Sequence, residues 1–72
     1  MAHLSPADWD RLERAVLDGR RIALTRSGRE LVVVPLRVFL QAGREAIEAR
    51  HPTTGHLLVR LIDELDAVEI LP

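Results

Sequence analysis

The middle of the chain reads Leu31-Val32-Val33-Val34-Pro35-Leu36-Arg37-Val38-Phe39-Leu40. Its first four residues are apolar at every position, which predicts a strand covered on both faces, by a barrel interior on one side and by an N-terminal helix on the other. Pro35 cannot donate a hydrogen bond to a neighbouring strand, so it predicts a bulge or an edge position where the strand bends sharply. The strand is expected to resume through Val38 to Leu40.

Shorter strands are predicted on either side of this long one. Residues 20–25 alternate, with Ile22 and Leu24 on one face, and Ser27-Gly28 supplies a hairpin turn. Ile47 and Ala49 are expected to point inward from the strand at 45–50. The remaining elements are turns at 41–44, 52–55 and 63–65, a strand in which Leu57, Val59 and Leu61 alternate, and a last strand around Val68 and Ile70.

A helix is predicted before the strands, from about Ser5 to Asp18. Ser5 is a suitable N-cap, Pro6 occupies the first helical position and Asp8 can complete a capping box. An apolar stripe at helical spacing follows, and it is formed by Trp9, Leu12 and Val16 with Ala15 beside them. Leu4 and Trp9 occupy the hydrophobic-staple positions, and Gly19 ends the helix.

These elements predict one domain over residues 1–72, with the helix at about 5–18 and a barrel at about 20–71. The fold class is mainly β with one N-terminal α-helix, as a small five-stranded antiparallel barrel of the Sm or SH3 type. The helix is expected to cover one open end. A domain of this size buries only about 60% of its unfolded surface, so a deep catalytic cleft is not expected.

The composition excludes several classes of protein. There is no cysteine, so disulfides, thiolate metal sites and cysteine nucleophiles are excluded, as suits a reducing cytoplasm. No apolar run approaches the roughly 20 residues that cross a bilayer, and no signal pattern opens the chain. The formal net charge of −1 argues against a protein that coats nucleic acid non-specifically. We therefore expect a cytoplasmic protein that is neither secreted nor embedded in a membrane.

No set of residues predicts catalysis, a metal or a cofactor. His51 and His56 flank the turn at 52–55 with Glu48 nearby in sequence, but zinc sites need further ligands, so solvated loop histidines are expected. Ser5 and Ser27 lack an adjacent base and acid. The acid pairs Asp8/Asp10 and Asp63/Asp66 are expected on solvated faces, and the turn glycines form no phosphate-binding loop. An enzyme is therefore not expected.

Direct RNA binding has limited support. Trp9 and Phe39 are the only aromatic residues of the types that stack on bases, and Trp9 is expected in the core. Four arginines around the first hairpin can meet phosphates or can simply be solvated, namely Arg20, Arg21, Arg26 and Arg29. A general Sm-like adaptor, either RNA-binding or oligomeric through open strand edges, is the alternative function.

Residues 5–70 resemble the Rho-binding antiterminator (Rof) family, and two segments carry most of the resemblance. The first is Asp8-Trp9-Asp10-Arg11-Leu12-Glu13-Arg14-Ala15, and the second is Leu61-Ile62-Asp63-Glu64-Leu65-Asp66-Ala67-Val68. The chain departs from the family at Trp9, where the family has tyrosine, and at Arg11, where its best-known members carry a small polar residue. The closing part is also similar to WYL-type sensor domains, although their tryptophan-tyrosine-leucine motif is missing.

The Rof resemblance implies a function and a partner. Family members dock on the basic RNA-binding surface of transcription termination factor Rho and compete there with the transcript. Docking of this kind needs carboxylates on a rigid element, and the candidate partner-binding residues on the helix are Asp8, Asp10, Glu13 and Arg14. The alternative is structural, with Asp10 paired to Arg14 within the helix and Asp8 acting only as the capping acid.

Overall fold

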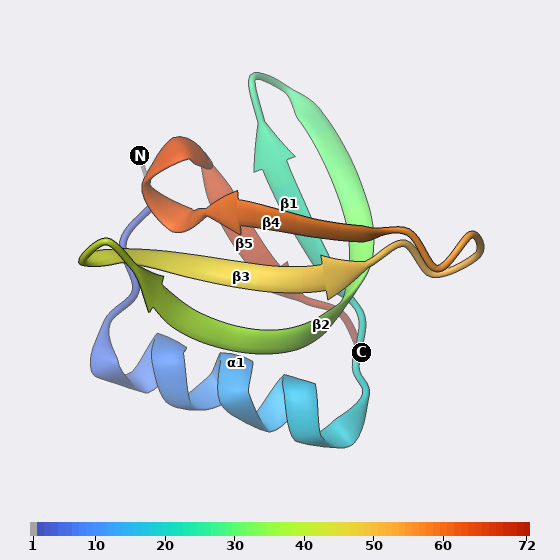
Figure 1. Ribbon diagram of the computed structural model, residues 1–72, viewed down its shortest axis with the longest axis horizontal. Coiled ribbons are helices and arrows are strands. Elements are labelled where there is room, and N and C mark those ends of the chain that lie inside the picture. The colour runs from blue at the N-terminus through green and yellow to red at the C-terminus, as the bar shows by residue number, and fades with distance from the viewer. Residues whose placement is uncertain (1) are drawn as a thin grey trace.

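The computed structural model describes residues 2–72 and contains one helix and one five-stranded antiparallel sheet in the order β4-β3-β2-β1-β5 (Figure 1). The elements are α1 (Pro6–Asp18), β1 (Ile22–Arg26), β2 (Arg29–Gln41), β3 (Arg44–Arg50), β4 (Leu57–Leu61), the 3-10 turn η1 (Ile62–Glu64) and β5 (Ala67–Ile70). The sheet curls around a shared interior, with α1 below β2 (Figure 1). This confirms the predicted fold class, a mainly β, barrel-like domain with an N-terminal helix.

The long strand β2 bends because it contains one extra residue. Its first part pairs with β1 and its second part pairs with β3, and the register shifts between Pro35 and Arg37. Leu36 therefore has no partner on β3 and forms the predicted bulge. Val33 and Pro35 point inward before the bulge and Val38 points inward after it, so the bulge keeps apolar residues on the core side of both halves.

The core is one buried cluster that includes both the sheet and the helix. Its members are Leu12, Ala15, Ile22, Leu24, Val33, Ile47, Ala49, Ile62 and Leu65. The prediction for the helix stripe is wrong in part, since Leu12 and Ala15 are buried as expected but Trp9 and Val16 are only half-buried. A small side chain at position 15 lets the helix backbone approach the sheet closely.

The helix lies over the core side of the sheet and not over its outer face. Leu12 and Ala15 share one cluster with Val33, whereas Val32 and Val34, on the opposite face of β2, are only half-buried. The expectation that the helix covers the outer face of the valine run is therefore wrong. The bent sheet and the helix enclose the same interior.

Two of the turns that the sequence predicted are tight two-residue hairpin turns. Ser27 and Gly28 both adopt positive φ, at 51° and 76°, and Ala42 and Gly43 do the same at 51° and 78°. Two consecutive residues with positive φ form a type I′ turn, which matches the right-handed twist of the strands that it joins.

The alternation predicted along β4 is present, but its leucines and valine face outward. Leu57 is 67% exposed and Val59 is 42% exposed, while Leu58 packs against the core. The strand is apolar at every position except Arg60, so a period of two cannot indicate which face is buried. The register with β3 decides it, because Leu58 lies opposite the buried Ala49.

Candidate docking surface on the helix

Helix α1 is fixed at both ends. The Ser5 hydroxyl accepts a hydrogen bond from the Asp8 amide at 3.1 Å, and the Asp8 carboxylate accepts one from the Ser5 amide at 3.2 Å. Pro6 occupies the first turn, and Gly19 closes the helix in the left-handed conformation at φ 67°. Both caps were predicted. They satisfy backbone groups that a helix end leaves unpaired, so the helix is a rigid support for its side chains.

Asp8 is engaged in the structure of the helix itself. Arg11 Nη2 donates to Asp8 Oδ1 at 2.6 Å, in addition to the capping bond from Ser5. Both interactions favour the charged carboxylate, and they hold the pKa of Asp8 below its ordinary value, with the Arg11 hydrogen bond as the larger cause. Of the four predicted partner-binding residues, Asp8 is therefore the one already bound to its neighbours.

Asp10, Glu13 and Arg14 lie on the outer flank of α1. At 100° per residue they point away from the buried Leu12, and all three are exposed. None of them forms an ion pair with any residue in the range 2–72. The intrahelical pair between Asp10 and Arg14 that the sequence left open is thus not formed, and the carboxylates of Asp10 and Glu13 face solvent.

Leu17 belongs to the same outer flank and was missed by the sequence reasoning. It is 82% exposed, the highest value among the exposed large apolar side chains of residues 2–72. Helical spacing places it one turn beyond Glu13 and two turns beyond Asp10. The available signal was that Leu17 is the one leucine of the helix outside the stripe formed with Leu12. The flank therefore combines two free carboxylates with an exposed apolar side chain.

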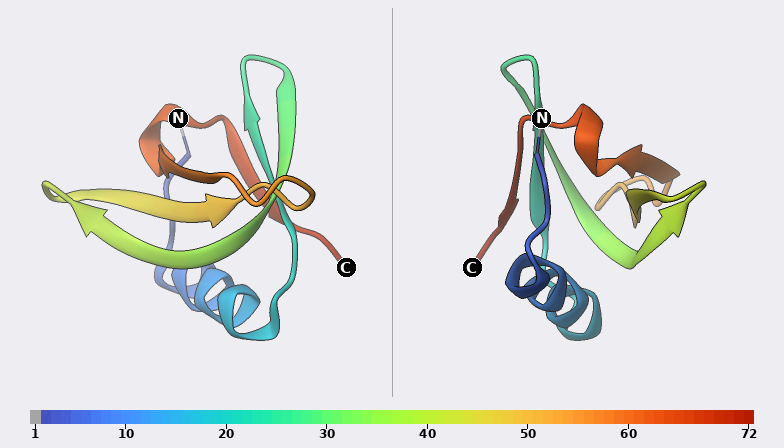
Figure 2. Two further views of the ribbon diagram at one scale, coloured as in Figure 1. Left: turned by 45° about the vertical axis from the view of Figure 1, so that its right-hand side comes forward. Right: turned by 90° about the vertical axis from the view of Figure 1, so that its left-hand side faces the viewer.

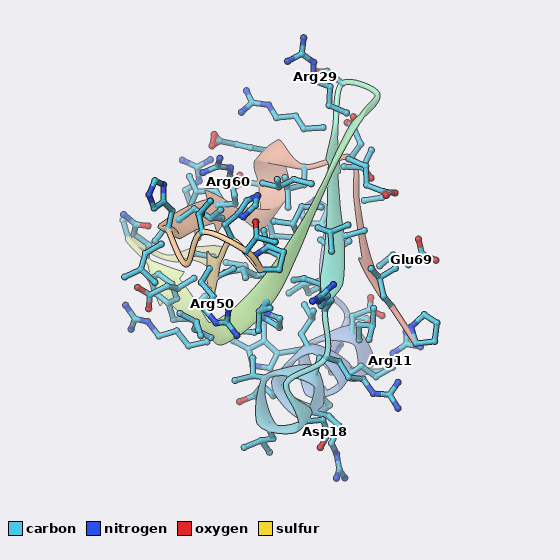
Figure 3. All side chains as sticks on the ribbon, turned by 90° about the vertical axis from the view of Figure 1, so that its right-hand side faces the viewer. Arg11, Asp18, Arg29, Arg50, Arg60 and Glu69 are labelled. Carbon is cyan, nitrogen blue, oxygen red and sulfur yellow. The ribbon has the colours of Figure 1, made fainter. Side chains whose placement is uncertain are left out.

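A groove of about 690 Å³ separates α1 from β5 on the other side of the helix. Its apolar lining includes Leu4, Leu12, Ala15, Val68 and Ile70, and its rim carries charged side chains of both signs. Arg14 is one of them, so it borders both this groove and the outer flank. Figure 3 shows Arg11, Asp18 and Glu69 around this region. The groove is open along its length, and the one ion pair on its rim is that of Arg11 with Asp8.

The two acids of the pair Asp63/Asp66 have separate structural roles. Asp63 accepts two hydrogen bonds from Arg44, at 2.7 Å and 3.0 Å, and these join η1 to the start of β3. The Arg44 guanidinium lowers the pKa of Asp63, and Asp63 raises the pKa of Arg44. Asp66 instead accepts a hydrogen bond from the Ser27 amide at 2.7 Å and supports the first hairpin turn.

The histidines flanking the β3–β4 turn do not converge with Glu48. The Nδ1 atom of His51 accepts hydrogen bonds from the Thr53 and Thr54 amides, both at 3.3 Å, so this ring stabilises the turn. Glu48 is paired with Arg37 on the sheet at 2.7 Å. Within residues 2–72, no group of three or more histidine or acidic side chains is arranged to hold a metal ion.

The four arginines of the first hairpin are exposed. Arg26 and Arg29 lie opposite each other beside the turn, and Arg20 and Arg21 precede β1. The tip of this hairpin projects from the barrel on the side away from α1, and Arg29 extends from it (Figures 1 and 3). Like charges directly opposite each other on a strand pair are unfavourable, so this pair has no stabilising role in the fold.

Comparisons with protein-family models, with curated proteins and with solved structures gave no match. The helix in the described part of the chain is too short and too polar to span a membrane. Figure 2 shows that α1 keeps one long side open to solvent, with the sheet entirely on the other side. The surface of this helix is therefore the basis for a functional proposal.

Proposed function

We propose that this protein binds transcription termination factor Rho through the outer flank of α1 and blocks its loading onto RNA. The observation that supports this proposal is that Asp10 and Glu13 are exposed and unpaired on a helix capped at both ends. The resemblance of residues 8–15 and 61–68 to the Rof family supplies the partner.

The chemistry of the flank suits a basic target. A surface that holds RNA must present arginine or lysine to phosphates, and carboxylates can replace those phosphates through charge-assisted hydrogen bonds. Asp10 and Glu13 are three positions apart, so they are neighbours on the helix surface. Because the helix is already ordered, binding loses less conformational entropy than it would with a flexible acidic segment.

The other two predicted docking residues have supporting roles in this proposal. The charge of Asp8 is neutralised by Arg11, and Asp8 maintains the N-terminal cap. The cap holds the first helical turns, and therefore Asp10, in a fixed position. Arg14 lies beside Asp10 on the helix surface and places a cation at the border of the acidic flank. A basic target surface is repelled there, so Arg14 fixes the orientation of docking rather than its strength.

Inhibition of Rho is the direct test. The protein is added at micromolar concentration to Rho, and RNA-stimulated ATP hydrolysis is measured. We expect inhibition by the parent protein and at least about a tenfold weaker effect with Asp10→Arg, since the attractive contact of Asp10 with a basic surface then becomes repulsive. Glu30→Arg is the matched control, because it makes the same charge change on the hairpin, away from α1.

Two results would contradict the proposal. One is unchanged Rho activity in the presence of the parent protein, and the other is equal inhibition by the parent and by Asp10→Arg. Loss of inhibition with Glu30→Arg as well as Asp10→Arg would show that net charge is responsible and would also reject docking through the helix.

A second candidate function is direct RNA binding by the first hairpin. The observation in its favour is the exposed cross-strand pair of Arg26 and Arg29, for which the fold gives no structural reason. Titration of a fluorescent single-stranded RNA at two salt concentrations tests it, because phosphate contacts weaken steeply as salt rises. Absence of binding at low salt removes this candidate.

A further inference from the structure

Strand β4 ends the sheet and has an unusually apolar free edge. It pairs only with β3, and its sequence Leu57-Leu58-Val59-Arg60-Leu61 contains a single charge. Natural proteins usually protect edge strands with several charges, prolines or bulges, because the unpaired backbone otherwise pairs with another chain. Here Leu57 and Val59 are also exposed on the outer face, at 67% and 42%.

One row of the outer face is apolar from β4 across the sheet, and the rows beside it carry Arg37, Glu48 and Arg50. Leu61 lies opposite Ala46 on β3, and Ala46 lies opposite Phe39 on β2, so all three share the outer face. Arg37 crosses this face, with its guanidinium carbon 4.0 Å from the centre of the Phe39 ring and its Nε 2.7 Å from Glu48. These charges satisfy each other. Exposed apolar side chains on an open strand edge are a site for pairing with another chain.

We propose that β4 pairs with β4 of a second copy of this chain, antiparallel and around a twofold axis at Val59. In this register Val59 lies opposite its own counterpart, Leu57 lies opposite Leu61 of the other copy, and Leu58 lies opposite Arg60. It is the one antiparallel register that pairs all five residues of the strand. The axis is perpendicular to the sheet, so both outer faces remain on the same side and their leucines meet.

Charge selects this register over its neighbours. A shift by one residue pair, with the axis at Arg60, would place two arginines directly opposite each other, which is unfavourable. In the register at Val59, each arginine instead lies opposite a leucine. In the single chain, Arg60 Nη1 donates to the Val59 carbonyl at 3.1 Å, and the exposed arginine side chain is free to move aside when a second backbone arrives.

The other free edge of the sheet is a poorer match for β4. Strand β5 has four residues, and Ala67 and Glu69 are the two that its register with β1 places on the outer face. Pairing β4 with that edge would place the Glu69 carboxylate among the exposed leucines and would leave apolar surface uncovered. Two β4 strands cover each other's leucines, so the symmetric pair is the one that the surface favours.

Cysteine cross-linking tests the register, because the native chain has no cysteine. Opposed residues on an antiparallel pair have Cβ atoms within about 5.5 Å, close to disulfide geometry. We expect Val59→Cys to form a disulfide-linked dimer under mild oxidation. Leu57→Cys alone is expected to stay monomeric on a non-reducing gel, because four residues offset two copies by roughly 13 Å. A mixture of Leu57→Cys and Leu61→Cys is expected to form the mixed dimer.

Light scattering after size exclusion tests the association without a covalent bond. We expect the parent to reach twice the chain mass of 8.1 kDa as concentration rises, and Val59→Lys to remain monomeric with an unchanged circular dichroism spectrum. Leu17→Lys makes the same kind of change at an exposed position on α1 and is expected to dimerise like the parent. This proposal does not involve α1, so its outcome is independent of Rho binding.

Three results would overturn the symmetric pair. The first is a parent protein that stays monomeric up to about 1 mM. The second is disulfide formation by Leu57→Cys alone as fast as by Val59→Cys. The third is an assembly larger than a dimer in which Val59→Cys does not cross-link. If Val59→Lys fails to fold, the cysteine variants decide, since Val59→Cys is a small change at a partly exposed position.

Discussion

Replacing Leu12 by alanine is expected to remove most of the stability of this domain. Leu12 is 2% exposed and belongs to the central cluster. Loss of its three outer side-chain carbons costs about 2.4 kcal/mol in transfer free energy, and the cavity that remains raises the cost to about 3–5 kcal/mol. A small domain is stable by only about 5 kcal/mol, so a large fraction of the variant would be unfolded at room temperature.

Leu17→Ala is the matched control for this change. It removes the same atoms from the same helix, with the same change in helix propensity, but Leu17 is 82% exposed. We expect it to alter the free energy of unfolding by less than about 0.5 kcal/mol. The difference between the two variants therefore isolates the burial of Leu12 against the sheet.

Urea denaturation followed by far-UV circular dichroism and by the fluorescence of Trp9 measures both variants. With a slope near 1 kcal/mol per molar urea, Leu12→Ala should lower the midpoint by about 3 M, or abolish the folded baseline. In the latter case Leu12→Met, which conserves volume, should refold with a loss below about 1.5 kcal/mol. Equal midpoints for Leu12→Ala and Leu17→Ala would refute the packing described here.

Three further changes test local features. Asp8→Asn should reduce the loss of stability in acid. Because Arg11 lowers the pKa of Asp8 from its ordinary 3.8, the stability supplied by the charged carboxylate is present above pH 3.8 and disappears as pH falls through the lower folded-state pKa. Urea denaturation at about pH 5 and about pH 2 measures this, and equal midpoints of parent and variant at both pH values would contradict it. Gly28→Ala should cost about 1 kcal/mol, measured by thermal denaturation, because alanine is strained at φ 76° although nothing lies within 4 Å of its Cβ; an unchanged melting temperature would contradict a type I′ turn. Deleting Leu36 leaves Pro35 and Val38 facing the core but removes the bulge that bends β2, so the urea midpoint should fall while the transition stays cooperative, and an unchanged midpoint would show that the bulge is dispensable.

Much of the fold was predictable because its signals are local. Ser5, Pro6 and Asp8 define the helix start through hydrogen bonds within four residues, and Ser27-Gly28 defines a turn through the backbone angles that two residues can adopt. Pro35 indicated the bulge because a missing amide changes pairing wherever it occurs. None of these signals depends on the rest of the chain.

The candidate site was only partly predictable for the opposite reason. The sequence offers both Asp8 and Asp10 as docking acids, and only the fold shows that Arg11 pairs with Asp8 and that Asp10 forms no ion pair with residues 2–72. Leu17 joins the flank because of its exposure, which a residue type does not reveal. Ion pairing and exposure both depend on distances that the chain sets only after folding.

The sequence by itself determined the bounds of the helix and the order of the strands and turns, since caps, turn residues and a proline act through the backbone beside them. Only the tertiary structure decided which faces are buried. It placed Ala15 rather than Trp9 in the core, and it turned Leu57 and Val59 of β4 outward. A strand that is apolar at nearly every position has no alternation of polar and apolar residues to show which face is buried. The burial of a large side chain such as Trp9 depends on the space between the helix and the sheet that faces it. Burial is therefore a property of two packed surfaces, and a single segment cannot specify it alone.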